Sequence, residues 1–412
     1  MARPRLLFVC SRWPWPVSTG HHRMMDQMIR HASAAYDVTV AALARGGEPA
    51  GRPPGTVGVF RLPLPGMAEI AANVALRRCG TLQECLFLSA AARRRLREIQ
   101  DELRPDAVLY DMLRASQYGV GSSAPAAGVR RVVYLEDLLS DRYARMRSGG
   151  GSVLGAFAGS FPRPVAAAAS LLPRLLMGLE SRLAARREAE TVLESDAAIL
   201  VSPREAAVLA ARTGGANIGV CPPYAPDLPP PGPWPAGEPR FAFVGSPKYA
   251  PNAQALRLFD AALGRLAASG IRPAASAYGE PDPGLKLGHI AVGGFAPDLG
   301  DALRPGTIMV APITAGTGVK TKILDAMARG VPVITTALGL EGLQAEAGIH
   351  AAVAEDETGF AVAISAALAD PAHMQAVGLK GRDYALRHHA DADIQANFLG
   401  VLSGAPAARL AA

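Results

Sequence analysis

The sequence has few cysteines and no clustered metal ligands. Its four cysteines, Cys10, Cys79, Cys85 and Cys221, are scattered over 412 residues and form no C-x-x-C pair. This spacing argues against a disulfide framework and against a cysteine zinc site, and it favours a reducing compartment. Asp, Glu and His nowhere occur at the spacing of metal ligands either, so the sequence predicts no bound metal.

Long apolar runs are also lacking. Leu6–Cys10 is too short for a signal peptide, and no small-residue cleavage site follows it. Residues Ser152–Leu179 approach membrane length, but three prolines and two arginines interrupt them, so no apolar span of about 20 residues survives. The sequence therefore predicts a soluble or peripheral protein.

Charged residues are sparse and nearly balanced. They make up 19% of the chain, half of the residues are hydrophobic, and Lys plus Arg exceed Asp plus Glu by 42 − 36 = 6. This composition supports large cores and excludes disorder for the bulk of the chain. The small positive excess suggests an anionic ligand or surface rather than a dedicated nucleic-acid binder.

Strand-like apolar runs alternate with helical patterns along the whole chain. Leu6–Cys10 and Val38–Leu43 read as strands, for example, with a helical pattern over His22–Ala35 between them. Such alternation predicts parallel β-α-β units. Residues 222–239 interrupt it with nine prolines in eighteen positions, which predicts a stiff linker. We therefore expect an α/β protein with two Rossmann-like doubly wound domains, whose ligand lies in a cleft outside the carboxyl ends of the strands.

The segment Ile308–Thr335 carries the most chemistry. A buried strand is followed by a Gly-Thr-Gly turn and then by a helical pattern with Lys320, Lys322 and Asp325. Free N–H groups at a helix N-terminus favour an anion, both lysines add positive charge, and Asp325 is placed to accept hydrogen bonds from a ribose. A ribose diphosphate fits this arrangement, although an ordinary β-α-β crossover with solvated lysines explains the same residues.

Two other nucleotide-binding motifs are absent. A P-loop needs a glycine directly before its Lys-Thr pair, but Val319 precedes Lys320 here. A nicotinamide-binding Rossmann domain needs G-x-G-x-x-G after its first strand, where this chain has Ser-Arg-Trp-Pro. The sequence thus argues against both.

Several segments follow one another in a recognisable order. They are Trp13–Arg23, Glu136–Tyr143, Val201–Ala206, Phe243–Asn252, Gly294–Leu299 and Ala311–Leu343. In this order they resemble family-4 retaining glycosyltransferases with the GT-B fold, also described as glycosyl transferases group 1. Ala311–Leu343 is similar to the nucleotide-sugar half of that family, and the likeness is weak over Gly46–Arg95 and Arg145–Leu176.

The resemblance implies transfer of a sugar from a UDP-, GDP- or dTDP-sugar to an acceptor hydroxyl, with retention and without metal or cofactor. The acceptor it implies is a glycan, a lipid-linked molecule or a small molecule, and the products are glycans, polysaccharides, glycolipids or glycosylated natural products. No nucleic-acid partner is expected.

One position departs from the family pattern. Many members carry two acidic residues around this turn, separated by seven residues; here Thr317 stands at the first position and Asp325 matches the second. No carboxylate can then be assigned to hold the sugar hydroxyls. Two alternatives stay open: a non-catalytic sugar-nucleotide or glycan-binding relative, and a sugar-nucleotide epimerase of the same architecture, whose carboxylates and histidine we cannot locate.

Stabilising the charge of the leaving diphosphate is the main catalytic effect we expect. We assign catalysis to Lys248 and Lys320, and the orientation of the acceptor hydroxyl to Asp137. Lys322 shares a helix face with Asp325, whereas Lys320 lies nearer the phosphates. His21 and His22 receive no role, because a histidine beside a tight turn is as often structural. The donor-binding candidates are Gly20, Arg23, Gly245, Ser246, Asn252, Gly316, Thr317, Gly318, Lys322 and Asp325.

Basic residues in the first half suit contact with a membrane surface. They are the run Arg93–Arg97 and the cluster Arg142, Arg145 and Arg147, with Val153–Leu179 as the apolar second signal. A solvated helix face explains the same charges. The expected location is the cytoplasm, with peripheral binding to the inner face of the membrane as an option.

The expected domain boundaries follow from these patterns. Residues 1–221 form an acceptor-side domain, 222–239 a linker, and 240–389 a nucleotide-sugar-binding domain. The C-terminal helix 390–412 is expected to pack back on the first domain, because Ile394, Phe398 and Leu402 are spaced four apart.

Overall fold

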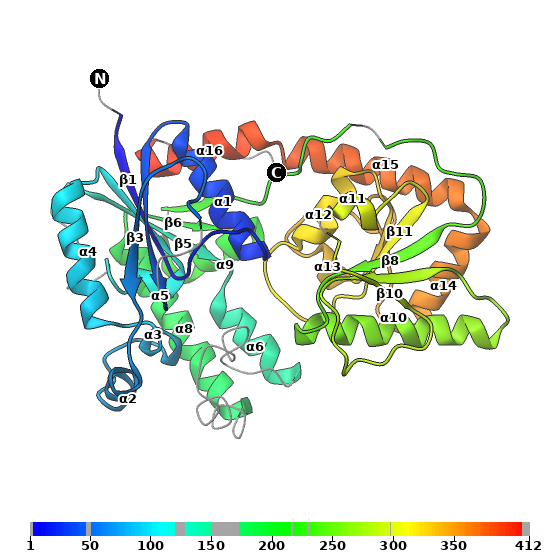
Figure 1. The fold of residues 1–412 in the computed structure, drawn as a ribbon, viewed down its shortest axis with the longest axis horizontal. Coiled ribbons are helices and arrows are strands. Elements are labelled where there is room, and N and C mark those ends of the chain that lie inside the picture. The colour runs from blue at the N-terminus through cyan, green and yellow to red at the C-terminus, as the bar shows by residue number, and fades with distance from the viewer. Residues whose placement is uncertain are drawn as a thin grey trace. The chain divides into compact units, whose positions relative to one another are not determined.

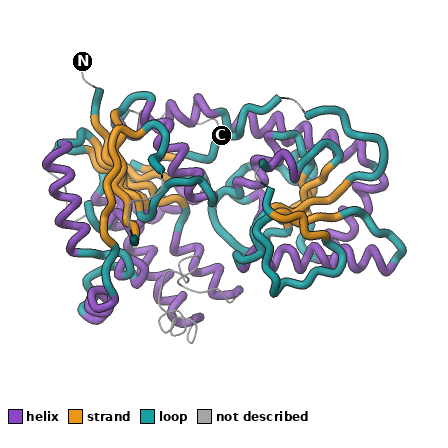
Figure 2. Tube along the Cα trace, viewed as in Figure 1, coloured by secondary structure: helices purple, strands orange, loops and turns teal. Residues whose placement is uncertain are grey.

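The computed structural model describes residues 3–46, 51–119, 128–149, 173–215, 217–229, 231–296 and 298–405. The chain forms two compact units, Met1–Pro223 with Ala392–Ala412, and Tyr224–Asp391. Each unit is a parallel sheet with helices on both faces (Figure 1 and Figure 2). The predicted fold class, α/β with two Rossmann-like doubly wound units, is confirmed.

The first unit is built on seven parallel strands in the order β3-β2-β1-β4-β5-β6-β7. The central strand β1 has five consecutive buried residues, as expected for a parallel strand covered on both faces. The edge strand β3 alternates between buried and exposed residues, because only one of its faces is covered. The strands are β1 (Arg5–Cys10), β2 (Asp37–Ala44), β3 (Thr56–Pro63), β4 (Ala107–Asp111), β5 (Arg130–Glu136), β6 (Ala197–Leu200) and β7 (Ile218–Val220).

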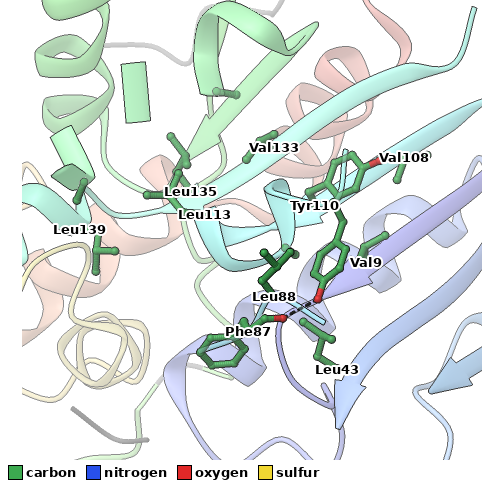
Figure 3. Close-up of a cluster of buried hydrophobic side chains, with 14 of the residues drawn as sticks. Val9, Leu43, Phe87, Leu88, Val108, Tyr110, Leu113, Val133, Leu135 and Leu139 are labelled. Atoms are coloured by element: carbon green, nitrogen blue, oxygen red, sulfur yellow. Dashed lines mark hydrogen bonds between the residues drawn. The ribbon is translucent and has the colours of Figure 1, made fainter. Parts of the chain in front are cut away.

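Helices cover both faces of this sheet. One face packs on α4 (Ala90–Leu103), α8 (Pro173–Glu194) and α9 (Pro203–Thr213). Figure 3 shows part of that core, with Val9, Val108 and Val133 of three neighbouring strands and Leu88 among its side chains. The short helices α2 (Met67–Ala75), α3 (Leu82–Cys85), α5 (Met112–Ser116) and α6 (Leu139–Gly149) complete the unit.

Helix α16 (Asp391–Ser403) belongs to the first unit although the second unit precedes it in the chain. Its Asn397 Nδ2 donates a hydrogen bond to the Val220 carbonyl of β7 at 2.6 Å. Its Phe398 ring lies 6.2 Å from the ring of His31 on α1 (Gly20–Ser33). The chain therefore leaves the first unit after β7 and returns to it through α16.

The second unit has six parallel strands in the order β10-β9-β8-β11-β12-β13. Phe241, Phe243 and Ile308 face the helices α10 (Ala250–Ala268) and α14 (Glu357–Ala369). Met309 and Ala311 pack toward α12 and α15 on the other face. The remaining elements are β8 (Arg240–Val244), β9 (Ala275–Tyr278), β10 (Ala291–Gly294), α11 (Leu299–Ala302), β11 (Thr307–Ala311), α12 (Thr321–Ala328), β12 (Val333–Thr335), α13 (Ala337–Leu340), β13 (Ala352–Val353) and α15 (Pro371–His388).

The proline-rich segment packs along the second unit. Trp234 contacts its core, and the N–H of Ala225 donates to the carbonyl of His389 at 2.8 Å. Arg382 of α15 donates hydrogen bonds to the carbonyls of Leu228 and Ala328. The described prolines are thus more than a spacer: their rigid rings cover apolar surface without requiring backbone donors.

Candidate functional site

Both sheets have a topological switch point, where the loops after two neighbouring strands leave toward opposite faces. In the first unit it lies between β1 and β4, and in the second between β8 and β11. Ligands of open α/β sheets bind at such points, outside the carboxyl ends of the strands. Most predicted site residues lie in the loops and first helical turns at these two places.

The loop after β8 is shaped by glycines. Gly245 has φ 146°, and a Cβ there would lie 2.7 Å from Asn252 Nδ2, which donates to the Ser246 carbonyl at 3.0 Å. A Cβ on Gly279, after β9, would lie 2.6 Å from the Gly245 carbonyl oxygen. Only glycine fits at these two positions, so the backbone can turn sharply at the end of β8.

Lys322 ties this loop to α12. Its ammonium donates to the Val244 carbonyl at 3.2 Å and to Asn252 Oδ1 at 2.9 Å, and it lies 4.6 Å from the centre of the Phe243 ring. Burial, with a smaller effect of Lys320, lowers the pKa of Lys322 to about 8. Lys322 thus brings its positive charge to the carboxyl end of β8 (Asn252 lies on the first turn of α10).

Lys320 folds back onto the Gly-Thr-Gly turn. Gly316 and Gly318 have φ angles of 126° and 65°, which favour glycine. The Lys320 ammonium donates to the carbonyls of Thr317 and Gly318 at 3.1 and 2.8 Å. Lys320 is the N-cap of α12, one residue before the helix begins, so its charge adds to the positive end of the helix dipole.

The other two donor-side candidates are placed differently. Lys248 forms an ion pair with Glu280, and both side chains are more than half exposed. An exposed pair of this kind contributes little stability, so Lys248 can exchange Glu280 for another anion. Asp325 is half-buried on α12, one turn after the N-terminus of that helix.

At the switch point of the first unit, His21 bridges two carboxylates. Its Nε2 lies 3.1 and 3.2 Å from the two oxygens of Asp111, at the end of β4, and its Nδ1 lies 2.9 Å from Glu136, at the end of β5. Ser11, just after β1, donates to Asp111 through its N–H at 2.9 Å and its hydroxyl at 2.6 Å. The ends of three strands and the first turn of α1 therefore meet in one charged cluster.

These groups are charged at neutral pH. Burial alone would lower the pKa of His21, but Asp111 and Glu136 raise it to about 9. Burial alone would raise the pKa values of Asp111 and Glu136, but His21 in particular lowers each to about 2. Perturbed groups of this kind, gathered at a switch point, indicate a functional site.

Asp137 is nearly buried and bound to Arg142. The Arg142 guanidinium donates to Asp137 through Nη2 at 2.6 Å and through Nε at 3.0 Å, and the Asp137 side chain is 3% exposed. Glu136, the preceding residue, is 18% exposed and has φ 68°, a left-handed conformation that is unusual outside glycine.

Gly20 and Arg23 lie in the first turn of α1. Thr19 caps this helix by accepting the His22 N–H at 3.2 Å, and the Arg23 N–H donates to the Thr19 carbonyl at 3.0 Å. Ser18 Oγ lies 3.0 Å from His22 Nδ1. Burial, followed by Arg12 and His21, lowers the pKa of His22 to about 4, so this imidazole is neutral.

The structure thus brings Gly245, Ser246, Asn252 and Lys322 together, and it places Lys320 on the 316–318 turn. Sequence reasoning missed the cluster of Ser11, Asp111, His21 and Glu136, although Asp111 and Glu136 both end strands. Within the described residues, no group of three His, Cys, Asp or Glu side chains is arranged to hold a metal ion. Among the described helices, none is both long and apolar enough to cross a membrane.

The comparison with protein families matches the second unit. Residues 238–370 match the family described as Glycosyl transferases group 1. This part of the chain is similar to a glycosyl transferases group 1 domain. It includes the loop after β8, the 316–318 turn and α12, so the glycine and lysine cluster lies within the domain. No curated protein sequence matches the chain significantly.

Solved structures share the fold over nearly the whole chain. Sucrose-phosphate synthase from Thermosynechococcus elongatus has a TM-score of 0.69 at 14% identity, with 97% of this chain and 98% of that chain covered. HepE from Anabaena, crystallised with UDP, has a TM-score of 0.65 at 14% identity over 97% and 100%. WaaG, described as a glycosyltransferase involved in lipopolysaccharide biosynthesis, has a TM-score of 0.58 at 13% identity over 97% and 100%. These likenesses establish the GT-B fold, and the domain match supports glycosyl transfer.

Proposed function

We propose that the protein is a glycosyltransferase that moves a sugar from a nucleotide-sugar donor to an acceptor hydroxyl, with retention and without a metal ion. The observation that carries the proposal is the cluster of glycines and lysines at the switch point of the glycosyl transferases group 1 domain. Its loop backbones can approach a ligand closely, and its charges favour an anion.

The proposed donor is a UDP-, GDP- or dTDP-sugar. The UDP and UDP-glucose bound in the HepE structures support a nucleotide-sugar donor in this fold. We assign the diphosphate to the 316–318 turn, Lys320 and Lys248, and the ribose hydroxyls to Asp325. Gly245, Ser246, Asn252 and Lys322 shape the donor pocket from the β8 side, and we add Gly20 and Arg23 of α1 as donor contacts.

The residues stabilise the departing diphosphate. When the bond between the sugar and the β-phosphate breaks, negative charge develops on that phosphate and the acceptor oxygen bonds to the sugar carbon. Oriented N–H groups and lysines can stabilise that charge, which makes a metal ion or other cofactor unnecessary. This role asks for positive charge at the N-terminus of α12, which Lys320 supplies.

We place the acceptor on the first unit, where Asp137 was assigned to orient its hydroxyl. Asp137 is bound to Arg142. To orient the acceptor hydroxyl, Asp137 must accept a hydrogen bond from it in addition to those from Arg142. The proposed location is the cytoplasm, with peripheral membrane contact through the basic residues of α4. The apolar stretch assigned to lipid contact is Val153–Leu179, and its residues 153–172 lie outside the described part of the chain.

A second candidate, a non-catalytic sugar-nucleotide binder, is favoured by one observation. Thr317 occupies the position where many family members have an acidic residue. An epimerase would need several carboxylates and a histidine in its donor domain. Neither the glycosyltransferase nor the non-catalytic binder requires them.

A calorimetric screen of UDP, GDP and dTDP in the presence of a metal chelator tests the proposal. We expect saturable binding of one nucleotide, with an affinity that the chelator does not change. A nucleotide affinity that appears only with added divalent metal would contradict metal independence, and no binding to any of the three would contradict the donor site.

A further inference from the structure

His21 links the buried interior of the first unit to one partly exposed carboxylate. The side chains of Asp111, His21 and Glu136 are 0%, 7% and 18% exposed, respectively. Asp111 is anchored by Ser11, His21 lies between the two carboxylates, and Glu136 is the member nearest the surface. Glu136 is therefore the most exposed of the three acids Asp111, Glu136 and Asp137.

The oxygen atoms of these acids are used unequally. Asp137 is engaged by Arg142, and Asp111 Oδ2 accepts both donors of Ser11. Glu136 Oε2 faces His21 at 2.9 Å and Arg142 at 3.9 Å. No residue of the described part of the chain donates a hydrogen bond to Glu136 Oε1. One carboxylate oxygen is therefore available at the carboxyl end of β5.

The backbone holds this side chain in an unusual conformation. Glu136 has φ 68°, and Met112, directly after Asp111 at the end of β4, has φ 60°. The pairing of β5 with β6 shifts register between Tyr134 and Glu136. Left-handed non-glycine residues are strained and persist where the surrounding structure enforces them, often at functional sites. At Glu136 the backbone therefore leaves the regular strand conformation of β5.

The charge balance indicates what Glu136 binds. Around Glu136 and His21 lie the carboxylates of Asp111 and Asp137 and the guanidinium groups of Arg12, Arg114 and Arg142. His22 is neutral, and the ring of Tyr134 stacks on His21. The three carboxylates are outnumbered by the four cations His21, Arg12, Arg114 and Arg142. A further cation has no excess charge to bind, whereas a neutral O–H group can donate to the available oxygen.

We propose that Glu136 accepts a hydrogen bond from the hydroxyl of the sugar acceptor, and that His21 is the positioning residue that holds the Glu136 carboxylate in place. This inference rests on the proposed glycosyl transfer and assigns its acceptor contact to Glu136 in place of Asp137. Glu136 only orients the hydroxyl. Because its pKa is held at about 2, it is a poor base, and the hydroxyl proton passes to the departing diphosphate oxygen as the new bond to the sugar forms.

Donor hydrolysis tests the proposal, because water then takes the place of the acceptor hydroxyl. The probes are UDP-glucose, GDP-mannose and dTDP-glucose, and the measured rate is release of the nucleoside diphosphate. We expect Glu136→Gln to lower kcat about tenfold or more while KM for the donor stays within about twofold, since the contact acts on the acceptor. Glu98→Gln, an exposed glutamate of α4, is the matched control and should behave as the wild type.

His21 is tested by the pH profile of kcat. His21→Gln removes the cation that lowers the pKa of Glu136, so burial raises that pKa and the rate should fall below about pH 6. His21→Lys keeps the charge and should restore the wild-type acidic limb. A purely structural role of His21 would lower the melting temperature without moving that limb, and this result would overturn the positioning role.

The outcomes separate the two proposals. Wild-type hydrolysis with unchanged kcat in Glu136→Gln overturns the acceptor contact and leaves glycosyl transfer intact, and a raised KM at unchanged kcat also overturns it. No hydrolysis of any probe by the wild type overturns the proposed function, and this inference with it. If His21→Gln fails to fold, His21→Lys and Glu136→Gln still decide the two roles.

Discussion

At the scale of single residues, Lys320 and Lys322 contact different parts of the predicted donor site. Lys320 lies on the 316–318 turn, and Lys322 lies under the loop after β8, where it bonds to Val244 and Asn252. The sequence predicted this divergence, because residues i and i+2 of a helix point about 200° apart. It did not predict that Lys322 would reach the end of another strand, since that contact depends on how α12 packs against β8.

The two lysines should differ in kinetics. Lys320→Ala should lower kcat about tenfold or more at nearly unchanged stability, because its charge acts mainly on the leaving group. Lys322→Ala should weaken nucleotide affinity more than it lowers kcat, because it loosens the loop after β8. Steady-state kinetics with calorimetry checks both, with the exposed Lys380→Ala as control. A silent Lys320→Ala together with an inactive Lys322→Ala would reverse the assignment.

Asp325 tests the nucleotide pose. If its carboxylate accepts the ribose hydroxyls, Asp325→Asn should weaken nucleotide binding by about 1–3 kcal/mol, the range for hydrogen bonds to charged groups. Calorimetric titration with the nucleotide measures this change. The matched variant Asp383→Asn, on α15, should bind as the wild type does. Unchanged affinity in Asp325→Asn would reduce Asp325 to a residue of the helix surface.

At the scale of elements, two glutamates of α8 accept hydrogen bonds from the N-termini of α3 and α6. Glu180 accepts the N–H groups of Leu82 and Gln83 at 3.0 and 2.9 Å, at the start of α3. Glu188 accepts the N–H and the hydroxyl of Ser140 at 2.8 and 2.6 Å, in the first turn of α6. Carboxyl groups at these positions satisfy the free N–H groups of the helix ends, so α8 fixes α3 and α6 through buried hydrogen bonds.

Glu188 should make stability depend on pH. Burial raises its pKa to about 7, while Ser140 and Arg212 lower it less. Since the folded state then binds more protons than the unfolded state between about pH 4.5 and 7, the free energy of unfolding should fall as pH rises through this window, by about 1–3 kcal/mol. Urea denaturation at pH 5 and pH 8 measures the slope. Glu188→Gln should flatten it, and the half-exposed Glu190→Gln should not. Equal slopes in all three proteins would refute the assignment.

The elements themselves were partly predictable. Continuous apolar runs identified β1, β2 and β11, because central parallel strands are buried on both faces. The edge strand β3 was missed, because its apolar residues alternate and lie in a stretch with little likeness to the family. The cluster around His21 was missed for another reason: Asp111, His21 and Glu136 are far apart in sequence, and only the parallel pairing of β1, β4 and β5 brings them together.

At the scale of the whole molecule, one design occurs twice. Both sheets place their first strand beside the fourth, and both carry their chemistry in the loops at that junction. In the second unit the junction holds glycines and lysines, which suit a diphosphate. In the first unit it holds a cluster of carboxylates and cations with one carboxylate oxygen available, which suits a hydroxyl. This division of charge matches a reaction between an anionic donor and a hydroxyl acceptor.

Hydrolysis of nucleotide sugars by the intact chain tests metal-independent glycosyl transfer most directly. UDP-glucose, GDP-mannose and dTDP-glucose are incubated with the protein in the presence of a metal chelator, and the release of the nucleoside diphosphate is measured over time. We expect one donor to be cleaved at a rate that the chelator does not change and that Lys320→Ala lowers about tenfold or more. Binding of a nucleotide without cleavage of any donor would contradict this expectation, and would identify the protein as a non-catalytic binder.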